Sequence, residues 1–229
     1  MFYAILSLAL VVCVYAPSLW VRWVMNNHSS DLVEMPGTGG ELADHLLKRF
    51  HLDGYEVEET EAMGDHFDPG AQRVRLQPKN HAGRSLTAVA IAAHEVGHAI
   101  QHHRQEKISK LRDRYVPRAK NLQRLGVICL SLVPLIGLLI KIPVIFIGFV
   151  ALGLGLQLCG ALAYLIVLPE ELDASFNKAL PILIEGNYIQ ADQVPAVEQV
   201  LRAAAYTYFA GALADVLNLG RWIVILLRR

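Results

Sequence analysis

The chain has 229 residues, 54% of them hydrophobic, and its 21 basic and 21 acidic side chains leave no formal net charge. The apolar fraction exceeds the range of about 45–50% typical of soluble domains. Because the excess is gathered in blocks, it predicts a mainly helical membrane protein. The balanced charge, without basic-aromatic clusters, argues against nucleic acid as a partner. The three cysteines lie in apolar runs without a Cys-x-x-Cys pair, so neither a disulfide framework nor a cysteine zinc site is indicated.

The first apolar block, residues 1–25, is predicted to be a transmembrane anchor. It is uncharged until Arg22, and Trp20 and Trp23 are suited to the membrane interface. No basic residues precede it and no small-residue cleavage site follows it, which favours an uncleaved anchor over a secretory signal.

Residues 26–124 have the mixed composition and the size of one small α+β domain. A capping-box pattern that begins at Thr38 predicts a helix through about Phe50. An extended segment follows at residues 55–60. Two more, joined by Pro69-Gly70, predict a hairpin over residues 65–77. Its second limb alternates polar and apolar residues, which predicts a strand with one face exposed. As a sheet edge it could pair with an extended peptide, and a plain structural hairpin is the alternative.

A His-Glu-x-x-His pattern occupies positions 94–98, within a predicted helix over residues 85–103. Side chains four residues apart share one face of a helix, so His94 and His98 can both direct nitrogens at one ion. Glu95 is offset around the helix and can reach a water held by that ion. This arrangement is typical of zinc peptidases, which use two histidine ligands and a glutamate base. His102 lies one turn farther along and is predicted to be too distant to be a ligand.

Residues 125–168 form a second apolar block, which is broken at residues 141–143. We predict a transmembrane helical hairpin with limbs near 125–140 and 142–168. Eight basic residues lie from Arg104 to Arg124, with Arg124 included, against two acidic ones. By the positive-inside rule this flank is cytoplasmic, and so is the domain that carries His94.

Residues 169–229 form a C-terminal helical part that begins with an acidic segment. Two membrane crossings return this segment to the side of the two histidines, so that a glutamate can supply the third zinc ligand. The candidates are Glu170 and Glu171, and Asp173 could accept a hydrogen bond from a ligand imidazole. The apolar stretch from about 201 to 227 is interrupted by Asp215. It could span the bilayer, lie on its surface or form two short helices.

Several segments in order along the chain resemble the bacterial membrane-bound neutral zinc metallopeptidases of the YugP type. The matching segments are Asp65–Pro69, Val74–Leu76, Gly83–Ser85, Ala88–Gln101, Leu168–Ser175 and Ala203–Tyr208. The resemblance implies a multi-pass membrane metallopeptidase with a zincin-like domain.

The chain is also distantly similar to the membrane gluzincins, in which the ligand glutamate is followed by alanine three residues later and then by aspartate. Glu171 and Ala174 fit that frame, whereas Ser175 stands at the aspartate position. The similarity therefore implies Glu171 as the third ligand, with Glu170 as its rival, and leaves the role of Asp173 open.

These features together predict a Zn²⁺-dependent endopeptidase in the cell membrane that cleaves membrane-associated proteins or peptides. Glu95 would act as the general base. One alternative is a site-2-type intramembrane protease, whose His-Glu-x-x-His helix would lie at bilayer depth. The other is a non-catalytic membrane adaptor with a vestigial metal site. The sequence does not indicate an oligomeric state.

Overall fold

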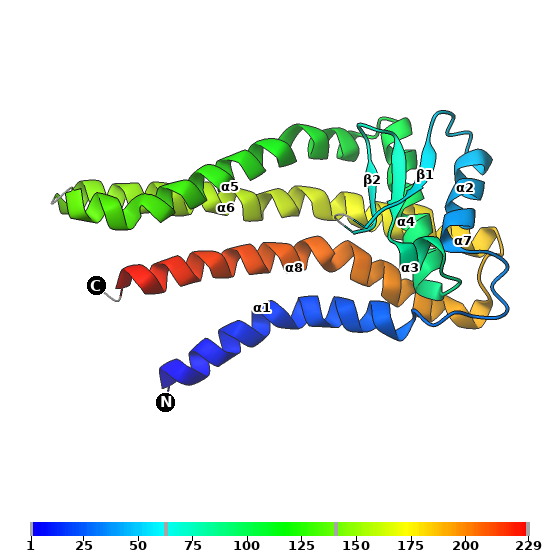
Figure 1. Ribbon diagram of the computed structural model, residues 1–229, viewed down its shortest axis with the longest axis horizontal. Coiled ribbons are helices and arrows are strands. Elements are labelled where there is room, and N and C mark those ends of the chain that lie inside the picture. Colours follow the sequence, from blue (N-terminus) through cyan, green and yellow to red (C-terminus); the bar gives the residue numbers. More distant parts are fainter. Residues whose placement is uncertain (1, 62–63, 140–141, 228–229) are drawn as a thin grey trace. The chain divides into compact units, whose positions relative to one another are not determined.

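The computed structural model describes residues 2–61, 64–139 and 142–227, which form two compact units (Figure 1). The mixed unit combines Ser18–Lys110 with Pro169–Thr207. The helical unit consists of Leu111–Leu168 and the two terminal stretches of the chain. Each unit therefore contains segments that are far apart in the sequence.

The first helix of the mixed unit after α1 (Phe2–Asn27) is α2 (Gly39–Arg49), and it begins at the predicted capping box. The Thr38 hydroxyl accepts a hydrogen bond from the backbone N–H of Glu41, and the Glu41 carboxylate accepts one from the backbone N–H of Thr38. Each bond satisfies a backbone donor that a helix start would otherwise leave without a partner. The predicted helix start is thus confirmed.

Three short strands form the sheet, namely β1 (Glu56–Glu59), β2 (His66–Asp68) and β3 (Arg73–Leu76). Their order is β1-β3-β2, with β2 antiparallel and β1 parallel to β3. The predicted hairpin is confirmed as β2–β3. The predicted sheet edge along β3 is wrong, because β1 pairs with the other side of that strand and makes it the central one.

Helix α4 (Leu86–His103) is the centre of the mixed unit. It follows the short helix α3 (Pro78–His81), and the side chain of Ser85 caps its first turn by accepting a hydrogen bond from Ala88 N–H. Every residue from Thr87 to Gln101 is buried, because α2, α3, β3 and the segment after Pro169 all pack against this helix. A helix enclosed on all sides holds its side chains in fixed positions.

The chain re-enters the mixed unit near the end of α6 (Pro143–Leu172) and continues as the π-helix η1 (Asp173–Ala179) and α7 (Leu180–Glu185). The single-turn helix η2 (Ala191–Gln193) leads into α8 (Val194–Leu227). The π-helix packs closely on α4 at Gly97, where an added Cβ atom would lie 2.9 Å from the carbonyl oxygen of Ala174. Glycine is therefore required for this approach of the two backbones.

The helical unit contains α5 (Lys107–Leu139) and α6 as neighbouring helices (Figure 1). They pack through small residues: a Cβ atom added at Gly126 would lie 2.6 Å from the backbone nitrogen of Gln157. Among the described residues, two stretches are long and apolar enough to cross a membrane, Lys107–Gly137 and Val144–Glu185. The two predicted hairpin limbs are thus found as helices, and both helices extend beyond the apolar block.

The C-terminal helix α8 is continuous over 34 residues, so the alternative of two short helices is wrong. Residue 141, in the break between the hairpin limbs, lies outside the described residues. The side chain of Asp215 does too.

Candidate metal centre

The two predicted histidine ligands lie one helical turn apart on α4, and both are buried. Their Nε2 atoms are 3.2 Å apart, and their rings meet at 82° with centroids separated by 4.6 Å. Because each imidazole directs its Nε2 atom at the same point, the two rings are arranged as a pair of metal ligands.

Glu171, near the end of α6, completes the group, although it is 77 residues from His94. Its Oε2 atom lies 3.2 Å from His94 Nε2 and 3.3 Å from His98 Nε2. Bonds of about 2.0–2.1 Å in a tetrahedral zinc site place neighbouring ligand atoms about 3.3–3.4 Å apart. The two nitrogens and the carboxylate oxygen therefore have the spacing and the chemistry of three zinc ligands.

The other carboxylate oxygen of Glu171 supports this fit. Glu171 is 1% exposed, and its Oε1 atom has no hydrogen-bond partner among the residues that the structure describes. A buried carboxylate oxygen without a partner is costly. An ion held at this carboxylate would compensate that cost.

Glu95 is also buried, beside the two histidines in the sequence of α4. Burial raises the pKa of its carboxyl above the ordinary value, and the negative charges of Glu171 and Asp65 raise it further. The imidazoles of His94 and His98 would oppose this shift when protonated. A raised pKa makes the carboxylate a stronger proton acceptor, as a general base requires.

Comparison with known proteins agrees with this geometry. The family described as "putative neutral zinc metallopeptidase" matches residues 3–227. The chain belongs to this metallopeptidase family. It is 29% identical over 235 residues to the "putative membrane protease YugP" of Bacillus subtilis (strain 168), and the match covers 97% of each chain. No solved structure matches the chain.

Glu170 and Asp173, the other two acidic residues predicted to take part in the site, lie beside the ligand group. The backbone carbonyl of Glu170 accepts a hydrogen bond from Gln101, whereas the Glu170 carboxylate is not part of the converging group. Asp173 accepts a hydrogen bond from Gln101 Nε2 at 2.8 Å and therefore reaches the imidazoles through another side chain. The sequence predicted a direct hydrogen bond between an imidazole and Asp173. In the structure Gln101 lies between them, with one hydrogen bond to His98 and one to Asp173.

Two residues without a predicted role contact the ligand imidazoles. Gln101 Oε1 lies 2.9 Å from His98 Nδ1, and Ser175 Oγ lies 3.0 Å from His94 Nδ1. Both positions carry a signal in the sequence. Gln101 follows His98 by three residues and shares its helix face, and Ser175 stands where gluzincins have aspartate.

The other histidine of the helix, His102, has a different environment. Its Nδ1 atom is hydrogen-bonded to the Tyr55 hydroxyl at 2.9 Å, and its ring contacts that of Phe67.

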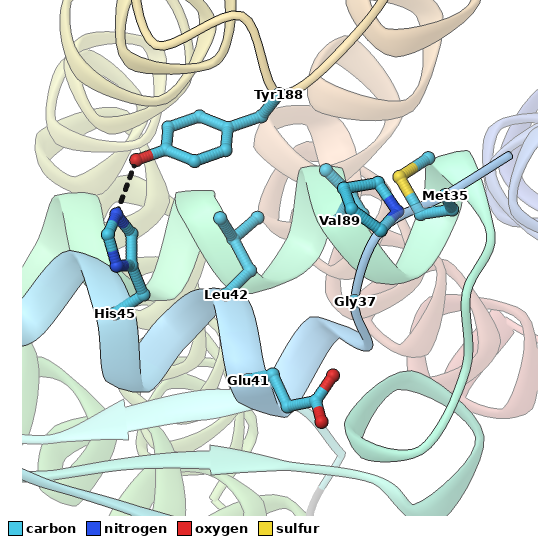
Figure 2. Close-up of a pocket in the computed structure, with 8 residues that line it drawn as sticks. Met35, Gly37, Glu41, Leu42, His45, Val89 and Tyr188 are labelled. Atoms are coloured by element: carbon cyan, nitrogen blue, oxygen red, sulfur yellow. Dashed lines mark hydrogen bonds between the residues drawn. The ribbon is translucent and has the colours of Figure 1, made fainter.

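A cavity of about 380 Å³ between α2 and α4 contains none of the ligand group (Figure 2). Its polar side chains have partners of their own: His45 is hydrogen-bonded to the Tyr188 hydroxyl at 2.8 Å, and Glu41 caps α2. The lining residues are Met35, Pro36, Gly37, Glu41, Leu42, His45, Val89 and Tyr188. The convergent ligand atoms therefore mark the candidate site, and this cavity does not.

Replacing Gly97 with alanine is expected to weaken both folding and metal binding. The added methyl group would press on the backbone of Ala174, and relieving that contact moves η1 and the preceding Glu171 away from α4. Overpacking of this kind costs about 1–3 kcal/mol. Thermal unfolding and zinc affinity measure the two effects. Gly155→Ala is the matched control, because nothing lies within 4 Å of its added Cβ atom. Unchanged stability and zinc affinity in Gly97→Ala would contradict the need for close approach.

Proposed function

We propose that the chain is a membrane-embedded, zinc-dependent endopeptidase whose ligands are His94, His98 and Glu171 and whose general base is Glu95. The observation that carries this proposal is the convergence of three buried ligand atoms within 4.8 Å of one another. Two of them come from α4, the helix that also carries Glu95, and the third comes from Glu171 on α6. Membership of the neutral zinc metallopeptidase family supports the same chemistry.

In the proposed hydrolysis, Glu95 carries out the proton transfers at the zinc site. A zinc ion bound here supplies a Lewis acid that polarises the scissile carbonyl and makes a water molecule more acidic. The Glu95 carboxylate takes a proton from that water as its oxygen bonds to the carbonyl carbon. Glu95 then delivers the proton to the leaving amine as the C–N bond breaks. Glu95 therefore ends the cycle unprotonated, as it began.

We place the mixed unit at the cytoplasmic face of the cell membrane, joined to several membrane-spanning helices. The two candidate spans and the name of the Bacillus relative support a membrane location. The basic residues that precede the apolar part of α5 support the orientation. From this location we infer that the substrates are membrane proteins or their cytosolic segments.

The orientation can be tested at Val33, which is fully exposed in the mixed unit. A Val33→Cys variant is expected to react with a membrane-impermeant thiol reagent in inverted vesicles but not in intact cells. The unsubstituted chain, whose three cysteines lie in apolar runs, is the control. Labelling of Val33→Cys in intact cells would place the mixed unit outside.

Metal removal tests the proposed activity. The purified protein is expected to contain one zinc ion per chain and to cleave an unstructured test peptide. A strong chelator should stop the cleavage, and added zinc should restore it. Zinc content by elemental analysis and peptide products by mass spectrometry are the measurements. A protein that binds zinc but cleaves no peptide would favour the adaptor, and chelator-resistant cleavage would contradict a metal mechanism.

A further inference from the structure

The hydrogen bonds on the outer side of the two imidazoles determine which ring nitrogen carries the proton. Ser175 Oγ lies 3.0 Å from His94 Nδ1 and 3.2 Å from the backbone carbonyl oxygen of Leu201. A hydroxyl has a single hydrogen, and a carbonyl oxygen can only accept. Ser175 therefore donates to Leu201 and must accept from His94 Nδ1–H. The proton on Nδ1 leaves the lone pair of Nε2 directed at Glu171.

The same reasoning fixes His98. Gln101 Nε2 lies 3.0 Å from the Glu170 carbonyl oxygen and 2.8 Å from Asp173 Oδ2, and both are acceptors. This assigns the amide orientation, so that Gln101 Oε1 is the atom that faces His98 Nδ1 at 2.9 Å. An amide oxygen can only accept, so His98 Nδ1 carries the proton and Nε2 is again free to bind an ion.

Gln101 also connects ligands from two parts of the chain. Its oxygen holds the imidazole of His98 on α4, while its nitrogen holds the backbone of Glu170, the residue before the ligand Glu171. Gln101 is itself fully buried. One side chain thus sets the position of the helix-borne histidine and of the carboxylate segment together.

A partly buried charge network keeps Gln101 in place. Asp173, which accepts from Gln101, pairs with the ammonium group of Lys178. Lys178 in turn lies 3.1 Å from the carboxylate of Glu106, just before α5. Lys178 is 9% exposed, whereas Asp173 and Glu106 are partly exposed. Removing either carboxylate would leave the buried ammonium group with one partner fewer, which is unfavourable.

We propose that Ser175 and Gln101 are positioning residues that present both histidines to zinc through neutral acceptors, and that Gln101 also fixes the distance between α4 and the Glu171 segment. This inference rests on the proposed zinc site. It assigns to a hydroxyl and an amide a task that carboxylates often perform around zinc. It also changes the role of Asp173, which here orients Gln101.

The test compares zinc affinity with folding. Zinc affinity is measured by competition with a chromogenic chelator, ligand geometry by the visible spectrum of the Co²⁺-loaded protein, and folding by thermal unfolding of the zinc-free protein. Ser175→Ala and Gln101→Met are each expected to weaken zinc binding about 10–100-fold and to change the Co²⁺ spectrum. Ser175→Thr, which keeps the hydroxyl, is expected to restore both.

Thr87→Val is the matched structural control. Thr87 is a buried residue of the same helix as the histidines, and its hydroxyl donates to a backbone carbonyl, that of Met25, at 2.9 Å, much as Ser175 donates to Leu201. Loss of this bond should lower the unfolding temperature and leave zinc affinity within about twofold.

Provided that the wild-type protein binds zinc, any of three results would overturn the inference. The first is a wild-type zinc affinity and Co²⁺ spectrum in Ser175→Ala and Gln101→Met, and the second is a zinc affinity in these variants equal to that of Thr87→Val. The third is a Ser175→Thr protein that binds zinc as weakly as Ser175→Ala does. A wild-type protein that binds no zinc would instead overturn the proposed function. If Gln101→Met does not fold, Gln101→Glu replaces it. That variant keeps an acceptor for His98 and removes both donated bonds, so weakened zinc binding is again expected and wild-type affinity overturns the role of Gln101.

Discussion

Replacing Glu95 with glutamine is expected to abolish peptide hydrolysis and leave zinc bound. Glutamine has the same size as glutamate but cannot take a proton from the attacking water, and general bases typically contribute about 10²–10⁴-fold to a rate. The three ligand atoms come from other side chains, so the metal site should persist. Peptide cleavage rates and the zinc content of the same preparation give the two readouts.

Glu34→Gln is the control for this substitution. Glu34 is exposed and lies in the segment before α2, so losing its charge should leave the cleavage rate unchanged. Retained zinc together with lost activity separates the base from the ligands. A Glu95→Gln protein with full activity would remove Glu95 from the mechanism.

Glu171→Gln is expected to lose zinc, whereas Glu170→Gln is expected to keep it. The two glutamates are adjacent and each is 1% exposed, so the pair is matched in burial and in the chemistry of the change. Glu171 brings an oxygen within 3.3 Å of both histidine Nε2 atoms, and it is the glutamate that converges with them among the described residues. Zinc affinity should fall by more than about 100-fold in Glu171→Gln, beyond the effect expected for a residue that only orients a ligand.

Chelator competition on both variants decides between the two glutamates. Asp173→Asn serves as a third comparison, since it keeps an acceptor for Gln101 and should retain more zinc than Glu171→Gln does. The opposite pattern, with zinc lost from Glu170→Gln and kept by Glu171→Gln, would transfer the ligand role to Glu170 and contradict the convergence seen in the structure.

The features that the sequence predicts well are those set by local periodicity. His94 and His98 meet because they are four residues apart on one helix, and Thr38 caps α2 through bonds to residues three positions away. The hairpin β2–β3 is equally local, because its turn brings the two strands together. The extended segment predicted at residues 55–60 is found as β1, but its parallel pairing with β3 was not predicted, since nothing in the alternation of β3 reveals which strand fills its second edge.

The surroundings of the ligands escaped prediction for a different reason. The chain after Glu171 leaves α-helical geometry and becomes the π-helix η1, in which each residue turns through a smaller angle. A period of 3.6 residues per turn therefore does not give the side-chain directions there. In this segment Asp173 meets Gln101 and Ser175 meets His94.

The order of the ligands along the chain also bears on how the protein is made. During translation His94 and His98 leave the ribosome long before Glu171, and all of α5 and nearly all of α6 is synthesised in between. A nascent chain that has not yet emerged beyond α6 cannot assemble the three-ligand centre. If hydrolysis depends on that centre, the newborn protein stays inert until α5 and α6 have been synthesised.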